Sequence, residues 1–119
     1  MTIATGQQIL ASDVLGLRFT EIWSATTNVG TNTNTWIDWD LSAIVPSGTK
    51  VVIVTIQLGP VTGYRGARKN GSTDSRTYSI RYDRDQVVVT LLCECDSNRV
   101  IEIYSCTDTD TFRIIGYQK

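Results

Sequence analysis

Hydrophobic and polar residues alternate along much of this chain, and short polar turns separate the alternating runs. The clearest run covers residues 35–41 (TWIDWDL), where alternate side chains of an extended strand must point to opposite faces. One face carries Ile37, Trp39 and Leu41, and the other carries Trp36, Asp38 and Asp40. The pattern predicts a half-buried strand with one polar face.

Residues 50–58 (KVVIVTIQL) are rich in β-branched side chains, which predicts a central strand covered on both faces. Six further strands are expected at residues 17–26, 63–69, 76–82, 86–94, 99–106 and 111–118. About eight short strands indicate an all-β, antiparallel two-sheet sandwich that is jelly-roll-like. The expected core consists of Ile37, Trp39, Val52, Val54, Ile56, Val87, Val89, Leu91, Ile101, Ile103 and Ile114.

Turn chemistry divides the chain between these strands. Asn70-Gly71 supplies the positive φ of a tight hairpin, and residues 83–85 and 96–98 are compact polar turns. One short helical turn at most is expected, at residues 12–15, because Gly16 stops it. A chain of 119 residues suits one core, so we expect an amino-terminal arm or anchor at residues 1–16 and a single sandwich domain at residues 17–119.

Composition narrows the function classes. The formal charge of −1 gives no bulk attraction to nucleic acid or to an anionic membrane, and no apolar stretch approaches the ~18 residues of a membrane span. Residues 1–10 lack the basic start and apolar middle of a secretory signal, so synthesis in a cytosol is expected. The chain contains no histidine, which is the commonest general base, and its serines form no nucleophile elbow. We therefore expect no enzymatic activity.

The cysteines fit a reducing compartment, because an odd number cannot all pair within one chain. Cys93 and Cys95 lie two apart in an extended run, where a disulfide between them would be strained. A zinc site would need Cys106 together with a carboxylate or a second subunit. Buried free thiols are the favoured interpretation, so the sequence predicts no cofactor, and no metal or disulfide required for folding.

Two sets of side chains are candidate ligand or partner surfaces. Around the Asn70-Gly71 turn stand Arg65, Arg68, Lys69 and Arg76. They form either a site for an anionic ligand or acidic partner, or a solvated hairpin tip whose charges discourage edge pairing, which we favour. The second set is Trp36 with Asp38 and Asp40, joined by Tyr64 and Tyr78. It can be a subunit contact, a tryptophan covered by a neighbouring loop, or a platform for a sugar ring. The acidic pairs Asp83/Asp85 and Asp108/Asp110 are interpreted as turn residues rather than a calcium site.

Several stretches of the sequence resemble one group of proteins. Residues 4–14 (ATGQQILASDV) resemble the leader of small structural proteins from tailed bacteriophages and prophages. Residues 39–42 (WDLS), 44–48 (IVPSG), 66–72 (GARKNGS) and 112–117 (FRIIGY) are similar to β-sandwich modules of phage fibres and capsid accessory proteins. The resemblance implies a virion component that decorates a head or tail or binds a host surface, and it carries over no site residue.

Two functions follow as hypotheses. The first is a non-enzymatic virion structural protein, made in the host cytoplasm, that docks on a major capsid or tail protein through residues 1–13. Surplus large apolar side chains indicate a homo-oligomer, and the resemblance implies a trimer. The alternative is a carbohydrate- or host-receptor-binding module that uses the Trp36 face or the polar loop at residues 27–34 to bind a surface glycan.

Overall fold

The computed structural model describes residues 19–82 and 87–119. Its strands are β1 (Thr20–Glu21), β2 (Ile37–Asp40), β3 (Val51–Gln57), β4 (Gly63–Lys69), β5 (Thr77–Ile80), β6 (Val88–Glu94), β7 (Val100–Ser105) and β8 (Thr111–Gln118). Those two stretches of chain contain no helix, and hence none that could span a membrane. The helical turn expected at residues 12–15, the arm at residues 1–16 and the turn at residues 83–85 lie outside the described residues.

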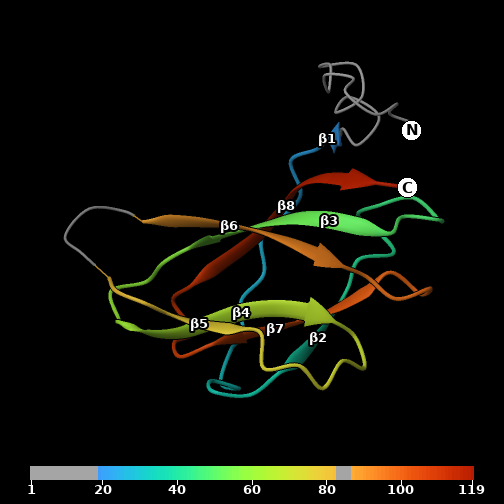
Figure 1. Ribbon diagram of the computed structural model, residues 1–119. Helices are drawn as coiled ribbons and strands as arrows, with labels where there is room; N and C mark the ends of the chain where they lie inside the picture. The colour runs from blue at the N-terminus through green and yellow to red at the C-terminus, as the bar shows by residue number, and fades with distance from the viewer. Residues whose placement is uncertain (1–18, 83–86) are drawn as a thin grey trace, which may run out of the picture.

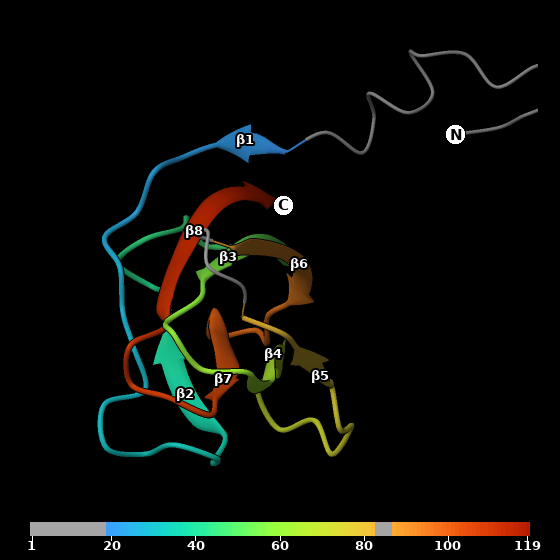
Figure 2. The same ribbon diagram turned by 90° about the vertical axis from the view of Figure 1, so that its left-hand side faces the viewer.

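The eight strands form two antiparallel sheets of four, in the orders β1-β8-β3-β6 and β2-β7-β4-β5. Figures 1 and 2 show the two sheets as stacked layers, and every connection between successive strands except that from β4 to β5 passes from one layer to the other. This strand order is that of a jelly roll, in which two Greek keys are wound into a double sheet. The all-β sandwich expected from the hydrophobic pattern is confirmed.

Strand β3 lies in the middle of its sheet, hydrogen-bonded to β6 on one side and to β8 on the other. Its side chains alternate between fully buried and half-buried, because only one face of the sheet covers the core. Val52, Val54 and Ile56 point inward, whereas Ile53 and Thr55 point outward. The prediction that both faces of this strand are covered is therefore wrong.

The core between the sheets consists of Val29, Leu41, Val45, Val52, Val54, Ile56, Leu58, Ala67, Cys93, Cys95, Ile101, Ile103, Phe112 and Ile114. Six of the expected core residues are fully buried, namely Val52, Val54, Ile56, Ile101, Ile103 and Ile114. The other five, Ile37, Trp39, Val87, Val89 and Leu91, are partly buried and pack against this core.

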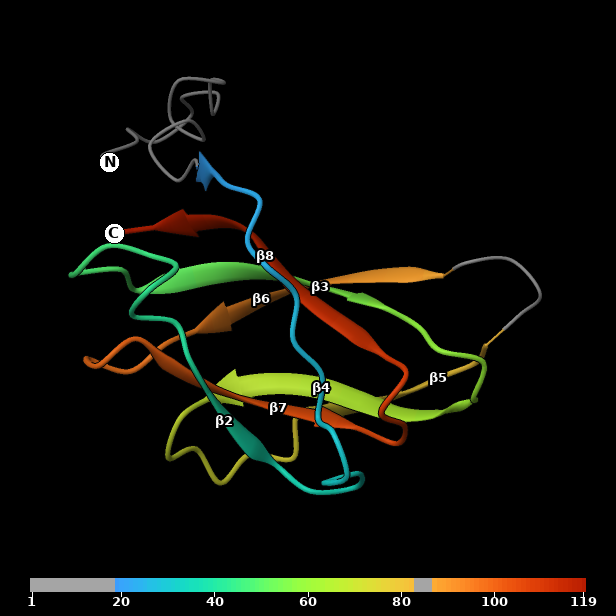
Figure 3. The same ribbon diagram turned by 180° about the vertical axis from the view of Figure 1, so that it is seen from behind.

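The strand expected at residues 17–26 is reduced to β1, with two residues paired to Tyr117 and Gly116 of β8. The chain then continues beside β8 through separate bonds, from Ile22 N to Ile115 O and from Ser24 N to Ile114 O. Ser24 interrupts a regular ladder, because its hydroxyl accepts from the Ile114 N–H at 3.0 Å. Figure 3 shows this segment descending from one sheet to the other before β2.

The connection between β4 and β5 is longer than a tight hairpin. Gly71 adopts the expected positive φ of 83°, but residues 70–76 separate the two strands. The returning chain passes so close to β4 that a Cβ on Gly66 would lie 2.0 Å from the carbonyl oxygen of Arg76. Gly66 is therefore required by backbone contact.

Candidate binding surfaces

Arg65 lies inside the sandwich and not on the cationic surface expected from the sequence. Both Arg65 and Asp110 have side chains with no solvent exposure, and the Arg65 Nε donates to Asp110 Oδ2 at 2.6 Å. A second bond runs from Arg65 Nη2 to Asp110 Oδ1 at 3.0 Å. The expected surface position of Arg65 is therefore wrong. Side chains alternate along β4, and Arg65 shares the inward face of that strand with Ala67.

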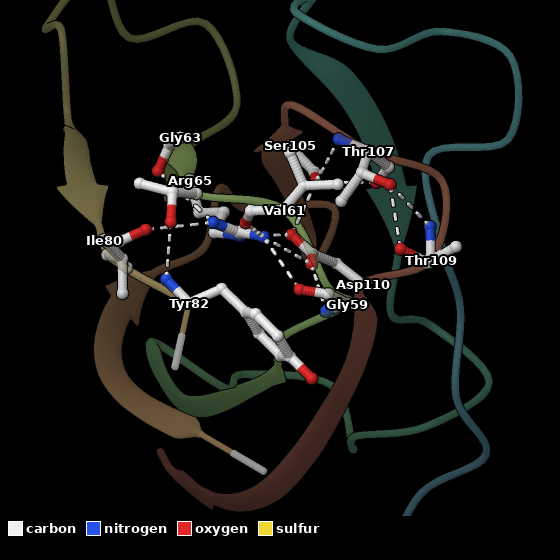
Figure 4. A network of polar contacts seen from close by, with 11 residues as sticks. Gly59, Val61, Gly63, Arg65, Ile80, Tyr82, Ser105, Thr107, Thr109 and Asp110 are labelled. Atoms are coloured by element: carbon white, nitrogen blue, oxygen red, sulfur yellow. Dashed lines mark hydrogen bonds and ion pairs between the residues drawn. The ribbon is translucent and has the colours of Figure 1, made fainter. Parts of the chain in front are cut away.

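The remaining polar atoms of this ion pair bind the neighbouring loops (Figure 4). The guanidinium donates to the carbonyl oxygens of Gly59, Val61, Gly63 and Ile80. Asp110 accepts from Gly59 N and from the Ser105 hydroxyl. Among the described residues, every buried side-chain nitrogen or oxygen has a hydrogen-bond partner. The Arg65–Asp110 network therefore ties the β3–β4 loop to the β7–β8 turn, and its hydrogen-bonding groups are engaged within the fold.

Arg68 and Trp36 meet on the outer face of the β2-β7-β4-β5 sheet. The Arg68 guanidinium lies 4.1 Å from the centre of the Trp36 ring, and the Tyr104 ring lies 5.3 Å from it. Arg68 also pairs with Glu102 at 2.7 Å and donates to the Asp74 carbonyl at 2.8 Å. One interpretation of Trp36 was that other parts of the same chain cover it, and its contacts with Arg68 and Tyr104 cover part of the ring. The indole face beneath Arg68 is occupied.

The other expected surface residues are dispersed. Lys69 forms an exposed pair with Glu94 at 3.2 Å, and Arg76 is exposed. Asp38 and Asp40 are exposed on β2, as its alternation predicted. The Ser42 N–H donates to Asp40 Oδ1 at 2.9 Å, and this bond lowers the pKa of that carboxyl. The cations thus do not converge on one anion site.

A polar groove of about 450 Å³ lies where the β2–β3 and β6–β7 connections meet the end of β4. Its walls include Lys50, Lys69, Glu94 and Asp96. Burial acts to raise the pKa of Asp96, but hydrogen bonds from the Asn70 amide and from the backbone N–H groups of Val100 and Asn98 outweigh it and lower that pKa. Both signs of charge are present and largely engaged within the chain, so the groove favours no charged ligand.

Trp23 forms a second groove that the sequence interpretation did not single out. Its side chain is 75% exposed, and the Arg113 guanidinium lies 4.0 Å from the ring centre. The groove of about 230 Å³ is completed by Thr55, Gln57, Val88, Thr111 and Ile115. The alternation of side chains along an extended segment could have identified Trp23 from the sequence. Ile22 packs against the core, so its neighbour Trp23 must face outward.

An apolar patch lies towards the other end of the same sheet face. It consists of Val51 and Ile53 of β3 and Leu92 of β6, and Leu92 is 59% exposed although it pairs with Ile53 in a regular ladder. Glu94 of β6 stands beside this patch, opposite Val51. We call Val51, Ile53 and Leu92 the β3–β6 patch.

The three cysteines, all within the described part of the chain, are free thiols. Burial raises the pKa of Cys93 to about 12, although the positive charge of Arg76 opposes the change. Burial also raises the pKa of Cys95. Because the thiolate is the reactive form, both groups are poor nucleophiles and poor metal ligands in the folded chain.

Comparison with known proteins adds no relative: no protein-family model matches this sequence, and none of the curated proteins does either. The class defined by the strand order is that of the all-β jelly-roll sandwiches. The functional argument depends on what the two sheet faces carry.

Proposed function

We propose that this chain is a non-enzymatic structural subunit of a phage virion, which self-associates and docks on a larger particle. The phage assignment is supported by the resemblance of residues 4–14 and of the sandwich motifs to phage structural modules. Self-association is supported by the β3–β6 patch. The trimer is proposed from the same resemblance.

Exposure of the β3–β6 patch is the observation that carries the proposal. Leu92 is 59% exposed in the middle of a regular strand, beside the half-buried Ile53 and Val51. Burying a leucine side chain contributes about 1.5–3 kcal/mol, so leaving Leu92 in water on the outer face of the edge strand β6 forgoes that stabilisation. Apolar side chains grouped on a surface are typical of protein interfaces.

The proposed occupant of the patch is a second copy of this chain. The same sheet face carries two acids, Glu21 and Glu94, beside the patch and one base, Arg113, towards the other end of the strands. When three copies bring this face to a common three-fold axis, each patch lies against those of its two neighbours and is removed from water, which agrees with a trimer. Attachment to a major capsid or tail protein is assigned to residues 1–13, on the resemblance alone.

Light scattering after size exclusion tests self-association. The wild-type chain is expected to have the mass of a trimer at micromolar concentration, and Leu92→Lys is expected to be monomeric because it places a charge in the contact. Tyr78→Lys is the matched control, since Tyr78 is 54% exposed on β5 of the other sheet. A monomeric wild-type chain would overturn self-association, whereas a dimer would overturn only the trimer.

Attachment to the larger particle is tested separately with purified phage particles. Deletion of residues 1–13 is expected to abolish binding to the particle and to leave the mass of the oligomer unchanged. Undiminished attachment of the shortened chain would overturn the docking segment.

A further inference from the structure

An apolar groove lies at the edge of the sandwich where the segment after β1 meets the β2–β3 connection. It measures about 390 Å³, and its walls are Ile22, Trp23, Ser24, Ala25, Ala43 and Ile44. None of these side chains is charged, and Ala25 and Ala43 are exposed. We call it the Ala43 groove. It is distinct from the groove that Arg113 shares with Thr55 and Gln57.

The open face of the Trp23 indole belongs to the Ala43 groove. Trp23 lines both grooves, whereas Arg113 lines only the other one. The Arg113 guanidinium stacks on that side, 4.0 Å from the ring centre, and the Trp23 side chain is nevertheless 75% exposed. The indole face turned away from Arg113 therefore borders the Ala43 groove. An aromatic wall in an apolar groove is typical of the pockets that receive anchor side chains in protein interfaces.

The Ala43 groove and the β3–β6 patch stand at opposite edges of one sheet. Strand β6, which carries Leu92, and strand β1, which leads into the groove, are the two outer strands in the order β1-β8-β3-β6. A contact between two different surfaces of the same chain is heterologous, and it forms a closed ring when the rotation between copies closes. A three-fold ring can therefore join the patch of each copy to the groove of the next.

The strand register brings Leu92 and the groove to similar heights along the strands. Leu92 pairs with Ile53, which pairs with Gly116 of β8. Gly116 in turn pairs with Glu21 of β1, so these residues form one row across the sheet. The walls of the groove begin at Ile22, the residue after Glu21. Because rotation about an axis parallel to the strands preserves height, Leu92 of one copy arrives beside the start of the groove of the next.

From this arrangement we propose that Leu92 of each copy inserts into the Ala43 groove of the next copy. The inference rests on the self-association proposed above and names the surface that receives the edge of the patch. Leu92 leaves water for the open face of Trp23, while Val51 and Ile53 stay on the face that turns to the three-fold axis. No ionised side chain lines the patch or the groove, so the contact requires no desolvation of a charge.

Disulfide cross-linking between copies tests the contact. In Leu92→Cys/Ala43→Cys, the new thiols of neighbouring copies are expected to lie within reach, since a disulfide needs Cα atoms about 4.4–6.8 Å apart. Oxidation of the full chain is expected to give covalent trimers on a denaturing, non-reducing gel. The wild type and each single variant are expected to give none, because a closed ring of disulfides needs both substitutions.

The gel is compared with the mass of the same sample by light scattering. A double variant that is trimeric in solution but forms no covalent trimer would overturn the inference and leave the proposed self-association intact. A wild-type chain that is monomeric would overturn the self-association itself, and the inference with it.

A filled groove provides a second test that needs no cysteine. Ala43→Trp places a large ring where Leu92 is proposed to sit, and it is expected to shift the mass from trimer to monomer at the concentration at which the wild type is trimeric. Thr26→Trp is the control and is expected to remain trimeric, since Thr26 is exposed beside Ala25 but outside the groove. Circular dichroism checks that both variants are folded. A folded, trimeric Ala43→Trp would overturn the insertion of Leu92.

Discussion

The Arg65 guanidinium and the Asp110 carboxylate, 45 residues apart in sequence, meet at 2.6 Å with no solvent exposure of either side chain. The pair stands at the end of the sandwich where the β3–β4 loop and the β7–β8 turn come together (Figure 4). An ion pair buried this completely costs desolvation, and its extra bonds to backbone groups offset that cost. Its structural consequence is that two loops are held by one cation and one anion.

Removing the anion from this pair should be strongly destabilising. Asp110→Asn leaves the Arg65 charge buried without its counter-ion, and we expect a loss of about 3–5 kcal/mol in the free energy of unfolding. Urea denaturation followed by circular dichroism measures it. The exposed Asp108→Asn variant has the same chemistry nearby and is expected to change stability by less than about 0.5 kcal/mol. Equal midpoints for the two variants would contradict the structural role of Asp110.

Two surface ion pairs should differ in coupling. Arg68 and Glu102 are 15% and 11% exposed, and Glu102 also accepts from the Gly71 N–H, whereas Lys69 and Glu94 are 46% and 61% exposed. Double-mutant cycles to alanine are expected to give a coupling of about 1–3 kcal/mol for the first pair, because its charges are shielded from solvent. The exposed pair is expected to give about 0–1 kcal/mol. A larger coupling for Lys69–Glu94 would contradict this assignment.

Gly66 should not tolerate a side chain. A Cβ there would lie 2.0 Å from the Arg76 carbonyl oxygen, so Gly66→Ala must push the β4–β5 connection away from the sheet. We expect a loss of about 1–3 kcal/mol in thermal or urea unfolding. Gly71→Asn is the control, since nothing lies within 4 Å of its Cβ position and asparagine accepts a positive φ. The interpretation fails if Gly66→Ala is as stable as the wild type.

Stability should fall in alkali because of Cys93. Its pKa in the folded chain is about 12, above the ordinary value of 9.0. The unfolded chain therefore loses the thiol proton at lower pH than the folded chain does. The stability that the protonated Cys93 thiol contributes is fully present below about pH 9 and is lost as pH rises towards 12. The slope from this group is at most about 1.4 kcal/mol per pH unit. Urea unfolding at several pH values, under reductant, measures the slope.

Cys93→Ala isolates this effect, since the other titrating groups remain in both proteins. The variant is expected to show a shallower fall of stability between about pH 9 and 12, and parallel curves for the two chains would contradict the assignment to Cys93.

Much of the fold follows from local pattern. Alternation along residues 35–41 and 111–118, with turn residues between strands, predicted β2, β8 and the two-sheet sandwich. The same rule predicted exposed Asp38 and Asp40 and a buried Ile101. Boundaries at β4 and β8 agree with the residues expected, since polar turn residues follow β4 and precede β8.

The candidate sites were predicted less well from the sequence, because they depend on which segments, distant along the chain, come into contact. A basic residue such as Arg65 is normally exposed, and only the meeting of β4 with the β7–β8 turn supplies the carboxylate that permits its burial. Trp23 drew no attention because its partner, Arg113, lies 90 residues away on another strand. By contrast, the sequence analysis included the possibility that Trp36 is covered within the chain. It did not identify Arg68 and Tyr104 as the residues that contact the ring.

The sequence by itself thus determined which segments become strands and which face of each strand is apolar, because both depend on side chains two residues apart. Only the tertiary structure decided that Arg65 is a core residue, that Leu92 stays in water and that Trp23 stands over a groove. Those outcomes depend on strand order and register, which bring residues from opposite ends of the chain within a few ångströms and set the charge and solvent that each one meets.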